Sequence, residues 1–198
     1  MNIAQQNCNE DLPITPDWRV LVDRFYGTNA LARNILIEHS RAVGTFAQEI
    51  NIARRLGLRP DEIMYGAMVH DIGIFLTEAP GIGCEGNRPY ICHGILGADL
   101  LRMSGAPEWA ARIAERHTGT GLTATDIATQ NLPLPTDRIL TPQTTLERLI
   151  CYADKFYSKR PGQLSIRKSL DRVRNEMKKH GTASLERFET MHHEFGAE

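Results

Sequence analysis

The stretch MVHDIGI, residues 68–74, is the most informative part of this chain because it sets a histidine and an aspartate side by side among apolar residues. A His-Asp pair alone is weak evidence of a site. Around His70 and Asp71, however, the chain carries His39 upstream, and His93, His117 and Asp154 downstream. This set supplies four imidazoles and two carboxylates, enough to hold two divalent transition ions.

Each of these residues also has a simpler explanation. His39 shares a helix face with Val43 and Ile50, where a histidine can bond a backbone carbonyl in the core. His93 and His117 lie at expected helix ends, where they could be surface caps. Asp71 and Asp154 are harder to explain in this way, because each lies on an apolar stripe and a buried carboxylate needs a partner or a metal. One metal site accounts for all six residues together.

Composition narrows the class of protein. The chain has 198 residues, 41% of them hydrophobic and 24% charged, as expected for one globular domain with a sizeable core. The net charge of −1 argues against a nucleic-acid partner. Neither a membrane helix nor a signal peptide is expected, since no long apolar run occurs and the N-terminus is polar. Four cysteines without close spacing, Cys8, Cys84, Cys92 and Cys151, predict reduced thiols and a cytoplasmic location.

Helical periodicity dominates the sequence, and no segment shows sustained strand alternation. We therefore expect one all-α domain over residues 1–198, with a core at about 29–158 and terminal helices packed on it. Thr15 is expected to open the first helix, the segment 81–87 to be a loop, and 120–142 to be a long loop with room for one short helix. The expected helices cover residues 16–26, 29–56, 60–70, 93–103, 107–117, 144–158, 164–179 and 184–195.

The pattern resembles the HD-domain superfamily of metal-dependent phosphohydrolases, in which HDIG is a known form of the central motif. The matching stretch runs from His39 to Asp154. The resemblance implies that His39, His70, Asp71 and Asp154 bind one metal, and that Asp71 bridges to a second ion held by His93 and His117. The ADK around Asp154 and the single His followed by Thr-Gly at His117 look like symmetrical diadenosine tetraphosphate hydrolases. The chain lacks the paired His found at the His117 position in relatives that hydrolyse cyclic dinucleotides, and it lacks the GYP motif of another branch.

A mixed imidazole and carboxylate set suits Fe best, with Mn, Co, Ni or Zn as alternatives, in one or two divalent ions. Such ions would activate a water for attack on phosphorus, with Asp71 and Lys155 as the catalytic residues. The expected substrate is a small phosphorylated molecule, in the first place a nucleotide. The candidate phosphate contacts, in falling order, are Lys155, Arg88, Arg160 and Arg116.

Two other functions fit the same residues. Some HD-domain proteins are mixed-valence di-iron oxygenases with this ligand order, and others are signalling modules without a working site. The complete set of six ligands argues against the second of these. A homodimer is left open. His180, His192 and His193 lie in charged sequence near the C-terminus and are expected on the solvated surface.

Overall fold

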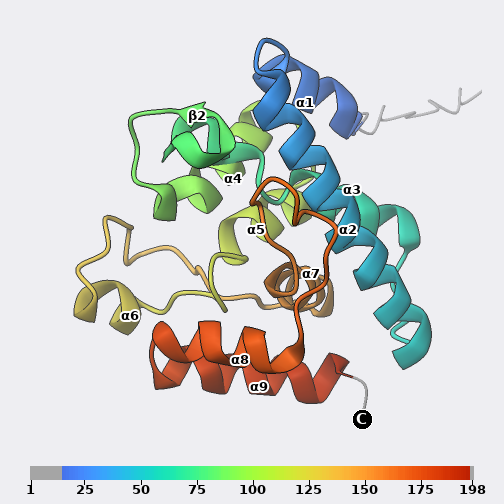
Figure 1. Cartoon of the computed structure of the whole chain (residues 1–198), viewed down its shortest axis with the longest axis vertical. Helices are drawn as coiled ribbons and strands as arrows, with labels where there is room; N and C mark the ends of the chain where they lie inside the picture. The colour runs from blue at the N-terminus through green and yellow to red at the C-terminus, as the bar shows by residue number, and fades with distance from the viewer. Residues whose placement is uncertain (1–14, 197–198) are drawn as a thin grey trace, which may run out of the picture.

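The computed structural model describes residues 15–196 and confirms the all-α architecture. Within that range it contains nine α-helices, three short 3-10 helices and one small hairpin (Figure 1). The α-helices are α1 Trp18–Tyr26, α2 Ala30–Arg54, α3 Pro60–Val69, α4 His93–Met103, α5 Glu108–Arg116, α6 Ala124–Thr129, α7 Thr145–Lys155, α8 Leu170–Lys179 and α9 Thr182–Phe195. The expectation about the N-terminal signal falls on residues 1–14, outside the described residues, and folding of the whole chain as one domain stays a prediction.

Several helix ends differ from expectation, among them the end of α7, which is Lys155 rather than residue 158, and the start of α9, which is Thr182 rather than residue 184. α1 is capped by Asp17, whose carboxylate accepts from the Arg19 amide, so Thr15 is not the cap. α2 ends at Arg54 because Arg55 already adopts left-handed geometry at φ 54°, before the expected stop at Gly57. α8 begins at Leu170, where the Ser169 side chain caps it, six residues later than its amphipathic pattern indicated.

The segment expected to be a plain loop contains a hairpin. Strands β1 Glu78–Ala79 and β2 Cys84–Glu85 pair antiparallel, on either side of the 3-10 helix η2 Pro80–Ile82. Two residues per strand are too few to show an alternating pattern, so the sequence carried no strand signal. The expected short helix in 120–142 is α6, which begins with a capping box between Thr123 and Asp126.

Two groups of buried apolar residues form the core. One packs α2 and α3 against α7, α8 and α9, with Tyr152 and Phe188 stacked at ring centroids 5.6 Å apart. The other packs α1, α2 and α3 against α4, α5 and the 3-10 helix η1 Ile72–Leu76. Figure 1 shows α1 at one end of the molecule and the pair α8 and α9 at the other, with α5 and α7 between them. The potential metal ligands lie in or next to helices of these two core groups.

The residues expected at the surface divide differently. His193 is exposed, but His192 is partly buried, stacks on Phe188 and places Nδ1 2.9 Å from the Tyr152 hydroxyl, which corrects the expectation. His180 is exposed. Cys84, Cys92 and Cys151 are free and buried, and Cys8 lies outside the described residues. None of the helices in residues 15–196 is both long and apolar enough to cross a membrane.

Candidate metal centre

The six predicted ligands lie in or next to six different helical segments and converge at the centre of the molecule. His39 lies in the middle of α2, and Asp154 lies in the last turn of α7. The other four lie at helix ends, where the backbone changes direction: His70 after α3, Asp71 before η1, His93 at the start of α4 and His117 after α5. Each of the six is at most 6% exposed.

Two glycines allow this convergence. A Cβ on Gly73, in the HDIG motif, would collide with the carbonyl of His93 and the backbone of Gly97. A Cβ on Gly94 would meet the Ala114 carbonyl oxygen at 2.7 Å. The absence of side chains therefore lets η1 and α5 approach the start of α4, which brings Asp71 and His117 up to His93.

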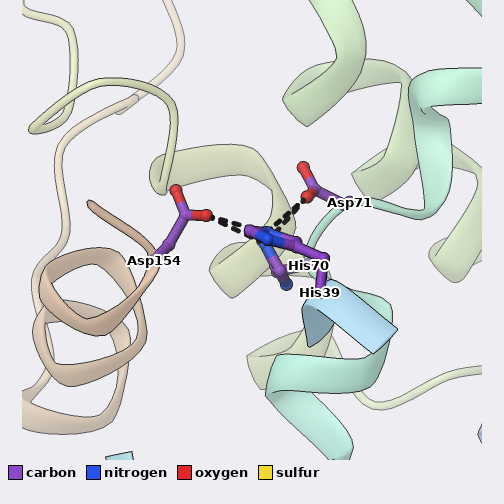
Figure 2. Close-up of side chains that lie close together, drawn as sticks. All are labelled: His39, His70, Asp71 and Asp154. Atoms are coloured by element: carbon purple, nitrogen blue, oxygen red, sulfur yellow. Dashed lines mark hydrogen bonds and ion pairs between the residues drawn. The ribbon is translucent and has the colours of Figure 1, made fainter. Parts of the chain in front are cut away.

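The ligand atoms form two groups that share Asp71. In the first, His39 Nε2 lies 3.0 Å from Asp154 Oδ1 and 3.3 Å from Asp71 Oδ2, and His70 Nε2 lies 2.9 Å from Asp71 Oδ2 (Figure 2). In the second, Asp71 Oδ1 lies 3.2 Å from His117 Nε2 and 3.4 Å from His93 Nε2. Asp71 thus turns one oxygen to each group, as a bridging carboxylate requires.

Backbone contacts orient three of the rings. The Nδ1 atoms of His70, His93 and His117 lie 2.6, 2.7 and 2.8 Å from the carbonyl oxygens of Ala67, Tyr90 and Ala114. A carbonyl oxygen can only accept, so each Nδ1 carries the proton and donates. This is the usual outer contact of a metal-binding histidine, and it aims Nε2 inward.

The charge states follow from burial and neighbours. Burial lowers the pKa of His93 to about 3 and also lowers the pKa of His117, so both rings are neutral near pH 7. Burial alone would lower the pKa of His70 as well, but Asp71 and Asp154 outweigh it and raise that pKa to about 9. Burial would raise the pKa of both carboxyls, yet the neighbouring cations hold each well below its usual range.

The donor set fits divalent cations. With Nδ1 protonated and the rings neutral, the lone pairs of His93 Nε2 and His117 Nε2 face each other across 3.0 Å. In the first group, His70 Nε2 lies 2.9 Å from Asp71 Oδ2 and His39 Nε2 lies 3.0 Å from Asp154 Oδ1, so ring nitrogens and carboxylate oxygens converge on one point. Lone pairs that face each other in a buried site, as those of His93 and His117 do, are costly, and a cation between them removes that cost.

Two lysines touch the carboxylates. Lys155, predicted from sequence, is buried rather than solvated, and its Nζ lies 2.8 Å from Asp154 Oδ2 and donates to the His117 carbonyl oxygen at 3.1 Å. Lys159 was missed. It follows α7, and its Nζ lies 2.7 Å from Asp71 Oδ2. Its only signal in the sequence is its place close behind Asp154, where we had named the adjacent Arg160 instead.

The three predicted arginines lie elsewhere. Arg116 is nearly buried, but its Nη1 is 3.0 Å from Glu147 Oε2, where it pairs with the carboxylate at the start of α7. That carboxylate also accepts from the Gln143 amide, and the Thr144 side chain caps α7 by accepting from the Glu147 amide. Arg88 and Arg160 are exposed.

A cavity of about 310 Å³ opens beside the centre. Its inner wall includes His93, His117, Asp154, Lys155 and Lys159, whereas none of the three arginines lines it. Its outer wall comes from the segment before and after α6 and from α8 and α9. The outer wall contains Leu122, Gln130, Leu132, Lys168, Glu176, Met177, His180, Ser184 and Arg187. Residues of the long loop 120–142 therefore line part of the cavity.

The family model described as the HD domain matches residues 36–158, which is more than half of the chain and includes all six clustered residues. The chain belongs to the HD-domain family. It is 35% identical over 129 residues to an uncharacterised protein of Methanocaldococcus jannaschii, covering 64% of this chain and 68% of that protein. HD domains bind divalent metals, in agreement with the cluster of histidines and aspartates found here.

A second relative is longer. The chain is 28% identical over 158 residues to a tRNA (cytidine(56)-2'-O)-methyltransferase of Thermoplasma volcanium, covering 80% of this chain but 41% of that protein. Among solved structures, the HD domain of the phosphodiesterase PgpH of L. monocytogenes in complex with cyclic-di-AMP superposes with a TM-score of 0.51 at 16% identity. The superposition covers 87% of this chain and 92% of the PgpH chain, and it shows a shared fold.

Proposed function

We propose that the protein is a phosphohydrolase that uses one or two divalent transition ions, Fe in the first place, to cleave a small phosphorylated compound. The observation that carries this proposal is the pair of ligand groups sharing Asp71 at the wall of a cavity. The HD-domain family and its phosphodiesterase structural relative support hydrolysis as the reaction class.

The chain's own residues supply position and charge. His39, His70 and Asp154 would hold one ion, His93 and His117 the other, and Asp71 both. Ions bound there would activate a water as the nucleophile and neutralise developing negative charge on phosphorus. Lys155 fixes Asp154 by holding Oδ2, so that Oδ1 faces His39 and His70. Two ammonium groups at one end of the cavity favour an anionic reacting group there.

The cavity suggests the size of the substrate. A volume of about 310 Å³ is at the lower end of the range for small-molecule sites and suits a mononucleotide or a compound of similar size. Its lining combines apolar side chains, such as Leu122 and Leu132, with polar Gln130, a combination suited to a base or another flat polar group. A diadenosine polyphosphate, the substrate of the relatives that the motifs resemble, would have to extend beyond this cavity.

The other relatives point less directly to a substrate. The PgpH domain shares the fold at 16% identity, and this chain lacks the paired histidine found at the His117 position in relatives that hydrolyse cyclic dinucleotides. The methyltransferase of T. volcanium matches over less than half of its length, so its RNA chemistry does not transfer. We therefore keep a small phosphorylated molecule, and first a nucleotide, as the substrate class.

A di-iron oxygenase is the main alternative. The experiment that separates the two is a screen of the metal-loaded protein against nucleoside mono-, di- and triphosphates, dinucleoside polyphosphates and cyclic dinucleotides, with release of phosphate or nucleotide as the readout. We expect cleavage of at least one compound without oxygen, and loss of cleavage in Asp71→Asn. Cleavage of none, together with oxygen-dependent turnover, would support the oxygenase.

A further inference from the structure

The buried pair of carboxylates at the centre raises a question of charge balance. Asp71 and Asp154 are both nearly inaccessible to solvent, and both approach the same atom, His39 Nε2, within 3.3 Å. Two like charges this close and this buried are costly unless cations pair with them.

The two lysines divide this task. Lys155 pairs with Asp154 at Oδ2, the oxygen turned away from the histidines, at 2.8 Å. Lys159 pairs with Asp71 at Oδ2, which is an oxygen of the first ligand group, at 2.7 Å, and also approaches Asp154 Oδ1 at 3.7 Å. Lys155 therefore contacts the Asp154 oxygen that faces away from the ligand histidines. The Lys159 ammonium instead contacts the oxygens of Asp71 and Asp154 that face those histidines.

The backbone that carries Lys159 is held in place. Beyond α7, the Tyr157 amide donates to the Asp154 carbonyl oxygen at 3.1 Å, and the Arg160 amide donates to Ser158 Oγ at 3.1 Å. The side chain of Lys159 is 18% exposed and also lines the cavity. Its ammonium thus lies between the carboxylates and the space proposed for the substrate. Because the side chain is long and flexible, a rotation can move the ammonium from Asp71 to an anion in the cavity.

We infer that Lys159 is a built-in substitute cation: it neutralises Asp71 in the metal-free protein, competes with divalent ions for that carboxylate, and becomes available to an anion in the cavity once ions bind. The inference rests on the proposed function only for the identity of that anion, a phosphoryl group. Within residues 15–196, Lys159 is the one lysine or arginine whose charged group lies within 4 Å of Asp71.

Two consequences follow from charge alone. A neutral side chain at 159 removes the competitor, so metal affinity rises while the metal-free protein loses stability. An anion that draws the ammonium into the cavity should tighten metal binding, and metal should tighten anion binding by the same factor, because such coupling is reciprocal. A lysine that served only as a substrate contact would produce neither effect on metal binding.

The test uses the full chain stripped of metal, with Mn²⁺ as the probe and free Mn²⁺ measured by electron paramagnetic resonance. We expect Lys159→Met to bind Mn²⁺ about 10-fold more tightly than wild type, equivalent to about 1.4 kcal/mol. Its metal-free form should melt at a lower temperature, and saturating Mn²⁺ should restore the melting temperature. Lys159→Arg keeps the charge and should retain the stability of metal-free wild type. Arg160→Met, which removes an adjacent exposed charge, is the matched control and should change neither property.

The coupling has its own readout. Millimolar inorganic phosphate should tighten Mn²⁺ binding in wild type and have much less effect in Lys159→Met. Equal or weaker Mn²⁺ affinity in Lys159→Met would overturn the inference, and so would a variant that stays unfolded with saturating Mn²⁺. If wild type binds no Mn²⁺ at all, the proposed function fails, whereas the melting temperature of metal-free Lys159→Met still tests the pairing with Asp71.

Discussion

His93 Nε2 and His117 Nε2 lie 3.0 Å apart, although each ring already donates its one proton from Nδ1 to a backbone carbonyl oxygen. Two neutral rings in this arrangement present lone pairs to each other. The structure holds them in place because the glycine contacts of η1, α4 and α5 fix the backbone on which they lie. A centre that repels itself unless a cation is present is built for a cation.

The two groups of ligands predict separable ions. We expect His117→Ala to retain about one ion per chain, held by His39, His70, Asp71 and Asp154, and to lose nearly all hydrolysis, because the second ligand group, whose ion would help to activate water and neutralise charge, is then incomplete. Metal content by mass spectrometry, measured beside phosphate release, checks this. His193→Ala removes an exposed histidine and should leave both unchanged. Two ions retained in His117→Ala would mean that His117 is only a helix cap.

Gly73 is expected to be needed for the fold as well as the site. Gly73→Ala places a methyl group against the His93 carbonyl and Gly97, and overpacking of this kind costs about 1–3 kcal/mol. Chemical denaturation measures this loss, and metal affinity should fall with it because Asp71 moves relative to His93. Gly81→Ala, at an open position with nothing within 4 Å, is the control. Equal stability of the two variants would show that η1 can shift without cost.

Lys155 is expected to act on a ligand as well as on the substrate. Lys155→Met frees Asp154 Oδ2 and the His117 carbonyl, so we expect turnover to fall by about 10-fold or more and metal affinity to weaken. The opposite sign for metal affinity in Lys159→Met distinguishes the two lysines. Isothermal titration with metal, followed by steady-state kinetics, measures both effects. Unchanged turnover and metal affinity in Lys155→Met would contradict this expectation and would show that the contacts with His39 and His70 are enough to hold Asp154.

Stability should depend on His192 in mildly acidic solution. Burial, and next Arg174, lower the pKa of His192 in the folded protein below the ordinary 6.5. A lowered pKa means that the unfolded chain takes up the proton first as the pH falls. The contribution of neutral His192 to folding stability is therefore intact above pH 6.5 and is lost as the pH falls through the folded pKa. We expect wild type to lose more stability between pH 7 and 5 than His192→Gln does, by thermal melting. His193→Gln should follow wild type, and a His192→Gln profile identical to that of wild type would contradict the expectation.

The sequence was sufficient to predict the potential metal ligands, because residue type and order along the chain identify them. The structure brings together His39, His70, Asp71, His93, His117 and Asp154, as their order and the resemblance to the HD-domain superfamily implied, although the helix ends at His93 and His117 also fitted surface caps. Proximity in sequence to these ligands was a poor guide to which lysine and arginine side chains reach the site. Arg116 precedes His117, but successive helical residues point in different directions, and Arg116 turns to Glu147.

Lys159 and the hairpin were missed for another reason. Lys159 lies beyond the end of α7, in backbone that has no helical periodicity, so its approach to Asp71 depends on the path of the chain. The hairpin pairs only Glu78 with Glu85 and Ala79 with Cys84, and both of its strands contact η1. Such features depend on tertiary structure, which local patterns do not encode.

The central claim is that Asp71, which both ligand groups share, holds the metal of this HD-domain protein, and the most direct test is the metal content of Asp71→Asn beside wild type. Both proteins are loaded with Mn²⁺ or Fe²⁺, freed of excess metal and measured by mass spectrometry, with circular dichroism to establish folding. We predict one to two ions per chain in wild type and loss of most of them in folded Asp71→Asn. Metal content equal to that of wild type in the folded variant would contradict the account.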